Sequence, residues 1–203
     1  MSCKLSQETI SNVIKFHGHS CPGLRIGIRV SELVRRELGD LPDARLVCIT
    51  ETDMCGVDAV QYLTGCTYGK GNLIHRDYGK TAFTFFDRET GRGLRCRLRS
   101  DARGDLAGEM SFLQQKIGSG EANDAEQARS KELRRQMEER LMTTDLDQLF
   151  EVTAPNVAMP RDARILANLV CETCGEETME SRTRRFNGQT LCKPCFNKVE
   201  QKV

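Results

Sequence analysis

The chain has 203 residues, of which 38% are hydrophobic and 29% are charged, and its formal net charge is +1. Balanced charge gives no reason to expect nucleic acid or an anionic membrane surface as the main partner. No run approaches the roughly 18 apolar residues of a membrane span, and the first ten residues lack a signal-peptide pattern, so we expect a cytoplasmic protein without a membrane segment.

The first 100 residues predict helices followed by strands. Ile10, Val13 and Ile14 at helical spacing, with Ser6 as a cap, predict a first helix over 7–16. A second helical period runs from Leu24 to Gly39. Further along, the sequence predicts a helix at 57–64 and strands at 45–50, 73–75, 81–86, 94–99 and 150–153. This order indicates an α+β domain with a mixed sheet.

A highly charged helix is expected over 121–142, with Leu133, Met137 and Leu141 as a narrow apolar stripe. Helices this polar usually bridge domains or pack on a second subunit. The proline-containing segment 154–167 is predicted to be a linker. The predicted organisation is a core domain over 1–153 and a cysteine-rich tail over 168–203.

The tail carries two CxxC pairs, Cys171 with Cys174 and Cys192 with Cys195, separated by 17 residues. This spacing is typical of a structural zinc site, in which two tight turns each present two thiolates to one ion. A segment this short needs the metal to fold, and the short helix expected after the second pair suggests a treble clef. Six Lys or Arg against five Glu over 171–203 form no strong basic face, so protein docking is the favoured role.

The stretch FHGHSCPG contains His17, His19 and Cys21 between the first two predicted helices. Gly18 and Pro22 disfavour helix here, and on an extended segment residues at i, i+2 and i+4 share one face. We therefore expect a metal site, although a solvated loop histidine is the common alternative. Cys21 lies at the start of the second helix, where the helix dipole favours a thiolate.

Two more cysteines could complete this site. Cys55 follows a predicted strand and precedes a helix, and Cys66 lies in the glycine-rich loop TGCTYGKGN. That loop fails the test for a phosphate-binding P-loop, because its glycine spacing is short and Gly71 follows Lys70 where Ser or Thr is required. The candidate catalytic residues are Cys21, Cys55 and Asp58. The alternative for Asp58 is an ordinary carboxylate on the helix surface.

The motifs FHGHSCPGLRIGIR, TDMCGVDAVQYLTGCTYGKGNL and DYGKTAFTF, taken in order, resemble the FmdE family, which is named for a component of molybdenum formylmethanofuran dehydrogenase. The resemblance covers about residues 11–100, and the tail resembles the treble-clef zinc finger of some members. It implies a thioredoxin-like core, a homodimer and a site, zinc-bound in some members, at His17, His19, Cys21, Cys55 and Cys66. It also implies an association with a molybdenum or tungsten enzyme complex.

Three functions fit these features. The favoured one is an accessory metal-binding protein, with zinc or another transition metal in the core site and structural zinc in the tail. The alternative is a zinc enzyme for hydrolysis or group transfer, in which Asp53 or Asp58 could act as an acid. In the third, both metals are only structural. Three protein ligands plus water would favour catalysis, and four protein ligands a carrier or structural role.

Overall fold

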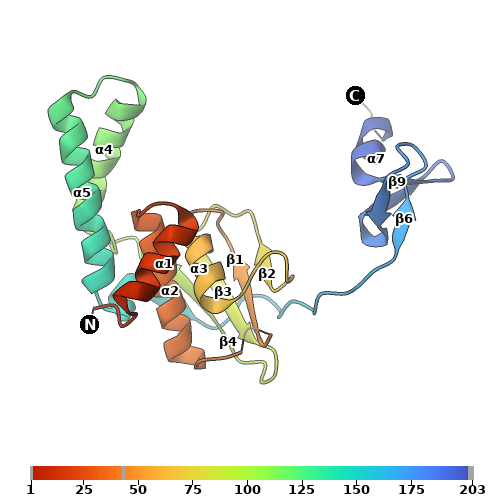
Figure 1. The fold of residues 1–203 in the computed structure, drawn as a ribbon, viewed down its shortest axis with the longest axis horizontal. Helices are drawn as coiled ribbons and strands as arrows, with labels where there is room; N and C mark the ends of the chain where they lie inside the picture. Colours follow the sequence, from red (N-terminus) through yellow and green to blue (C-terminus); the bar gives the residue numbers. More distant parts are fainter. Residues whose placement is uncertain (1, 43, 201–203) are drawn as a thin grey trace. The chain divides into compact units, whose positions relative to one another are not determined.

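The computed structural model describes residues 2–42 and 44–200, which divide into two compact units between Asp162 and Ala163 (Figure 1). This division lies inside the segment predicted as the linker. Within the described residues, no helix has both the length and the apolar composition that crossing a bilayer requires.

The first unit contains helices α1 to α6 and strands β1 to β5 of the described residues. In chain order they are α1 (Gln7–His17), α2 (Pro22–Leu38), β1 (Leu46–Thr50), α3 (Gly56–Thr64), β2 (Leu73–His75), β3 (Ala82–Asp87), β4 (Gly93–Leu98), α4 (Leu106–Gly118), α5 (Asp124–Thr143), α6 (Leu146–Leu149) and β5 (Phe150–Thr153). Ser6 caps α1 as predicted, by accepting a hydrogen bond from the Thr9 N–H. Of these elements, α4 and the short α6 were not predicted.

The strands form one mixed sheet in the order β2-β1-β3-β4-β5. β1 and β2 are parallel, and the other neighbours are antiparallel. The predicted α+β class and mixed sheet are thus confirmed, and the thioredoxin-like label stays a prediction. β1 is buried along its whole length, and the chain leaves its end at Thr50 toward Cys55 and α3.

The main core lies between the helices and one face of the sheet. Ile26, Val30 and Leu33 of α2 pack in one cluster with Phe83 and Phe85 of β3. A smaller cluster on α1, α2 and α3 contains Ile10, Val13, Leu24, Ile28 and Ala59. It joins these three helices and includes Cys21.

The hairpin α4–α5 projects from the rest of this unit (Figure 1). Leu133, Met137 and Leu141 of α5 are buried in the main core cluster, and α5 packs on α2 and α4. The apolar stripe is thus covered within its own unit by α4 and α2, and packing of the polar helix on a second subunit stays a prediction.

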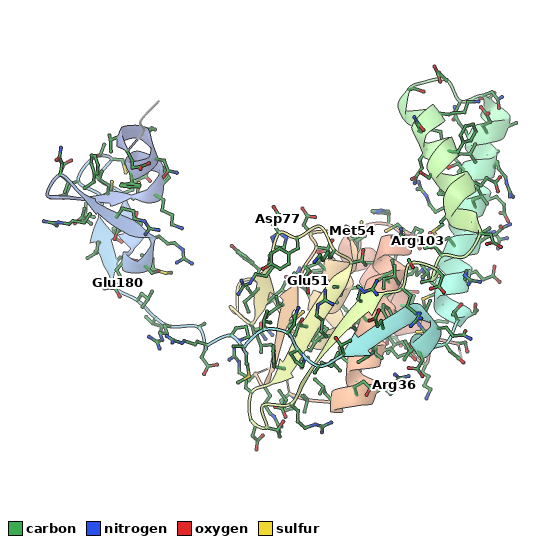
Figure 2. The ribbon with its side chains drawn as sticks, turned by 180° about the vertical axis from the view of Figure 1, so that it is seen from behind. Arg36, Glu51, Met54, Asp77, Arg103 and Glu180 are labelled. Carbon is green, nitrogen blue, oxygen red and sulfur yellow. The ribbon has the colours of Figure 1, made fainter. Side chains whose placement is uncertain are left out.

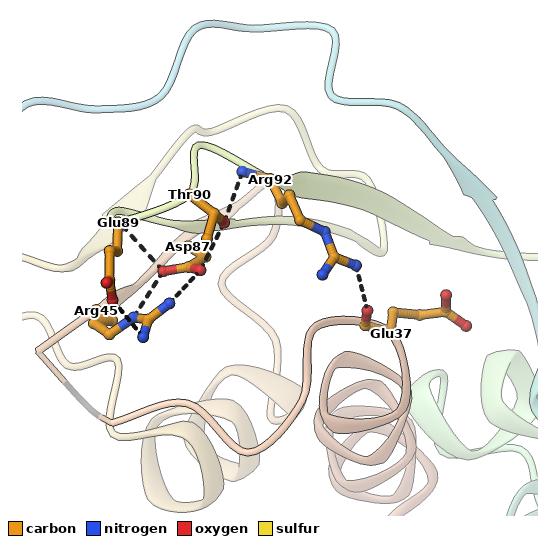
Figure 3. Close-up of polar contacts among 6 residues, drawn as sticks. All are labelled: Glu37, Arg45, Asp87, Glu89, Thr90 and Arg92. Carbon is orange, nitrogen blue, oxygen red and sulfur yellow. Dashed lines mark hydrogen bonds and ion pairs between the residues drawn. The ribbon is translucent and has the colours of Figure 1, made fainter.

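The turn between β3 and β4 is closed by Asp87, which is 4% exposed (Figure 3). Its carboxylate accepts from Arg45 Nε and Nη2 at 3.0 and 2.6 Å, from the Thr90 hydroxyl at 2.7 Å and from the Glu89 N–H at 3.1 Å. These bonds hold the pKa of Asp87 well below its usual range, with the Arg45 bond as the largest cause. Because Asp87 pairs with Leu46 at the start of β1, this turn lies opposite the end that leads to Cys55.

The second unit is small and is built around its cysteines. Its elements are β6 (Asn168–Val170), β7 (Glu177–Met179), the 3₁₀ helix η1 (Glu180–Arg182), β8 (Thr183–Phe186), β9 (Gln189–Cys192) and α7 (Lys193–Val199). β6 with β7 and β8 with β9 form two antiparallel pairs. Its buried cluster consists of Leu191 and three of the four cysteines, with Phe186 and Phe196 packed against them.

Candidate metal sites

Four side chains of the core unit meet where α1 ends and where α2 and α3 begin. The possible ligand atoms of His17, His19, Cys21 and Cys55 all lie within 4.8 Å of one another. Cys21 is buried, His17 and Cys55 are half-buried, and His19 is exposed. Three of these residues come from FHGHSCPG and the fourth from the loop after β1, as expected for a shared site.

The local geometry of the first three residues differs from the prediction. His17 is the last residue of α1, and Gly18 adopts the left-handed conformation with φ 95°, which glycine tolerates best. The chain then reverses, the rings of His17 and His19 lie 4.5 Å apart, and Cys21 is the extended N-cap of α2. The predicted extended ligand face is therefore wrong, and the ligands converge because a helix ends between them.

Cys55 reaches the site because α2 and α3 approach closely through glycines. A Cβ atom on Gly27 would lie 2.0 Å from the Gly56 carbonyl oxygen, so only glycine fits there. One turn earlier, a Cβ on Gly23 would lie 3.3 Å from the Cys55 Cβ. The helix starts that carry Cys21 and Cys55 are thus held together by backbone contact. The spacing of Gly23 and Gly27 in the sequence is the signal that could have revealed this.

Asp58 orients His17. Its Oδ2 lies 2.7 Å from His17 Nδ1. An ionised carboxylate only accepts hydrogen bonds, so Nδ1 carries the proton and a neutral ring presents Nε2 as a lone-pair donor. Nε2 is buried and has no hydrogen-bond partner among the described residues. A carboxylate behind one nitrogen of a histidine and a bare second nitrogen form the usual arrangement of a metal-ligating histidine.

The thiol of Cys21 does not have the lowered pKa that its helix position predicted. Burial raises its pKa, although the Leu24 N–H donates to its Sγ at 3.3 Å. Desolvation of the thiolate outweighs the helix terminus. A bound cation would reverse this, because metal coordination deprotonates a thiol outright.

Cys66 does not belong to the core site, which corrects the prediction that it supplies a ligand. It is fully buried in the main core cluster and its Sγ contacts the Leu46 carbonyl oxygen at 3.5 Å. The surrounding loop is held by Asn72, which accepts from the Thr67 N–H at 2.9 Å and donates to the Leu46 carbonyl at 3.1 Å. The glycine-rich loop is therefore a structural turn.

The tail brings its four cysteines together as the spacing predicted. The ligand atoms of Cys171, Cys174, Cys192 and Cys195 lie within 4.8 Å of one another. Backbone N–H groups of Cys174 and Cys192 donate to Cys171 and lower its pKa to about 6, whereas the neighbouring thiol of Cys192, with burial, raises the pKa of Cys195 to about 12. The shifts favour the thiolate of Cys171 and the thiol of Cys195, and a bound cation would favour the thiolate form of the whole group.

Both groups fit a soft or borderline divalent cation. Two imidazoles with two thiolates, and four thiolates, are the donor sets that tetrahedral zinc sites use. The buried Nε2 of His17 gives this fit independent support in the core unit, because a coordinated ion would satisfy it. The fold and the two cysteine-containing clusters define an α+β protein with metal-binding features and a zinc-finger tail.

The family model described as "FmdE, Molybdenum formylmethanofuran dehydrogenase operon" matches residues 16–151. The chain belongs to this FmdE family. A second model, described as "Prokaryotic dksA/traR C4-type zinc finger", matches residues 164–201. These matches cover the core site and the tail respectively.

Two individual proteins are also similar. A protein of Archaeoglobus fulgidus named "Probable S-adenosyl-L-methionine-binding protein" is 30% identical over 189 residues, which cover 89% of this chain and 50% of the relative. The chain therefore spans about half the length of that relative. The crystal structure of a tungsten formylmethanofuran dehydrogenase FmdE-like protein from Syntrophus aciditrophicus shares the fold, with a TM-score of 0.60 and 24% identity over 96% of this chain and 94% of the other.

Proposed function

We propose that the protein is a zinc-binding accessory protein, with one metal in the core site and a structural zinc in the tail. The observation that carries the core site is the buried, unbonded Nε2 of His17, a side chain that groups with two thiols and a second imidazole. His17, His19, Cys21 and Cys55 would hold the ion. Four protein donors leave no open position, which favours a carrier or sensor over a catalyst.

Metal content tests this proposal. The full chain is purified without oxygen, and zinc per chain is measured for the wild type, for His19→Ala with Cys21→Ala, and for Cys171→Ala with Cys174→Ala. We expect each double variant to lose about one equivalent of zinc. Cys3→Ala is the matched control, because Cys3 is a half-buried thiol outside both groups. If the core variant retains the zinc of the wild type, the core site is not a metal site.

A zinc-dependent hydrolase or group-transfer enzyme is the second candidate, and the exposure of His19 supports it. An exposed ligand can be displaced, which would leave three protein ligands and one open position. Zinc would then supply Lewis acidity, while Asp58 holds the His17 ring in its ligating orientation. Cobalt substitution separates the two candidates. A visible spectrum that changes on addition of thiocyanate indicates an open position, and an unchanged spectrum supports the accessory role.

We further propose that the tail, in a treble-clef arrangement, docks a protein partner, and that this partner is a molybdenum or tungsten enzyme complex. Family membership supports the choice of partner, and two β-hairpins followed by α7 support the treble clef. The chain acts as a homodimer in this proposal. Sedimentation of the full chain tests the dimer, and molybdenum or tungsten in material co-purified with the tagged full chain tests the partner.

A further inference from the structure

Two cavities share one residue, Arg103, and the larger of them reaches the core metal site. The larger, of about 400 Å³, is lined by Pro22, Gly23 and Met54 on the side of the metal site, and by α4 and α5 on the other. The smaller, of about 250 Å³, lies where β3 begins and β4 ends. Gly23 connects the larger cavity to the site, because a Cβ there would lie 3.8 Å from the Cys21 Sγ and 3.9 Å from the Cys55 Sγ.

The walls of these cavities combine positive charge with methionine. Arg103 and Arg134 line the larger cavity together with Met54, Met110 and Met137. The smaller cavity is lined by Lys80, Arg97, Arg99 and Arg103. Among the residues the structure describes, no Asp or Glu lines either cavity. Five cationic side chains thus line the two cavities, although the formal net charge of the chain is only +1.

Several of these cations are not neutralised by the protein. Arg97 pairs with Glu151, and Arg99 lies 3.7 Å from Asp101. For Lys80, Arg103 and Arg134, no carboxylate lies within ion-pair distance in the described part of the chain. Glu51, a buried carboxylate directly after β1, is held by Arg95 in two hydrogen bonds of 2.6 and 2.8 Å, and Lys80 interacts with it only at longer range. Figure 2 shows Glu51, Met54 and Arg103 at this edge of the core unit.

We propose that these cavities bind a small organic anion, a carboxylate or phosphate ester with an apolar chain, with its anionic group on Arg103 and its chain on the three methionines. Arginine suits this role because its planar guanidinium presents paired donors to carboxylate and phosphate oxygens. Methionine side chains adapt to apolar ligands of irregular shape. The position beside Cys21 and Cys55 brings such a ligand to the metal site. The proposal goes beyond metal binding and depends on its own observations.

Matched six-carbon probes test the proposal on the full zinc-loaded chain: adipate, hexyl phosphate and uncharged hexane-1,6-diol. The chain is labelled with ¹³C at the methionine methyl groups. We expect at least one of the two anions to shift the Met54, Met110 and Met137 signals and to leave Met159 and Met179, which lie outside the cavity, unchanged. The anion that binds more tightly shows whether the site prefers a carboxylate or a phosphate group. Absence of any shift with both anions, or equal shifts with the diol, would overturn the proposal.

Two arginine variants sharpen the result. Arg103→Gln should weaken anion binding about tenfold, which is the effect of losing one charge-assisted hydrogen bond. Arg134→Gln, tested separately, should also weaken anion binding. Arg92→Gln is the control, because Arg92 lies at the β3–β4 turn and donates to the Glu37 carbonyl instead (Figure 3). An equal loss in Arg92→Gln would mean unspecific attraction and would refute the site. Zinc is measured on the same samples, so the anion site and the metal proposal succeed or fail separately.

Discussion

The hydrogen bond between Asp58 and His17 gives the sharpest prediction about the core site. Removing a carboxylate behind a metal-ligating histidine costs about 10-fold to 100-fold in metal affinity in characterised sites. The Nδ1 to Oδ2 distance of 2.7 Å indicates a strong bond, but the Asp58 side chain is 40% exposed and water can partly replace it. We therefore expect the lower end for Asp58→Ala, a loss of about tenfold, which corresponds to about 1.4 kcal/mol.

Competition with a chromogenic zinc chelator measures this affinity on the oxygen-free full chain. Asp58→Asn should lie between wild type and Asp58→Ala, because an amide oxygen still accepts from Nδ1 without the negative charge. Asp53→Asn is the charge-matched control, since Asp53 is an exposed carboxylate of the loop before Cys55 that lies outside the group. If Asp58→Ala binds zinc as tightly as the wild type, or Asp53→Asn is equally weakened, the orienting role of Asp58 is refuted.

Three further predictions concern stability. In urea unfolding, Gly27→Ala should lower the free energy of unfolding by about 1–3 kcal/mol, because the added Cβ meets the Gly56 backbone. Gly108→Ala is the matched control in α4: the added Cβ meets open space, so the free energy of unfolding should rise by up to about 1 kcal/mol. Cys171→Ser should release the tail's zinc and expose the tail to protease, while the core unit's urea midpoint stays unchanged. Asp87→Asn should destabilise the protein at pH 7, and the difference in urea midpoint between wild type and variant should be smaller at pH 3. A lowered folded-state pKa contributes stability that is complete above the unfolded pKa of about 3.9 and declines as pH falls from there toward the folded pKa. A difference that persists or grows at pH 3 would contradict the last of these.

Local patterns in the sequence were enough to predict the strongly periodic elements and the cysteine group of the tail. Buried β1 and the cap at Ser6 follow from such patterns, because hydrophobic spacing and capping act over only a few residues. The two CxxC pairs in the tail are equally local, since each pair lies within one tight turn. Family resemblance added the expected family of the core, which the family match confirms.

The composition of the core site, by contrast, depends on tertiary packing. Cys55 and Cys66 lie at opposite ends of α3, and the contact between Gly27 and Gly56 brings Cys55 to the histidines while Cys66 lies in the core. The partner of His17 lies 41 residues away in the chain, and no local pattern predicts that pairing.

The partner of the apolar stripe of α5 was also decided by packing. The sequence did not reveal α4 as this partner, because α4 has only Met110 and Leu113 as buried residues and so gives a weak helical pattern. Contacts between residues far apart in the chain determine which side chains and helix faces meet. Patterns within a few neighbouring residues do not contain that information.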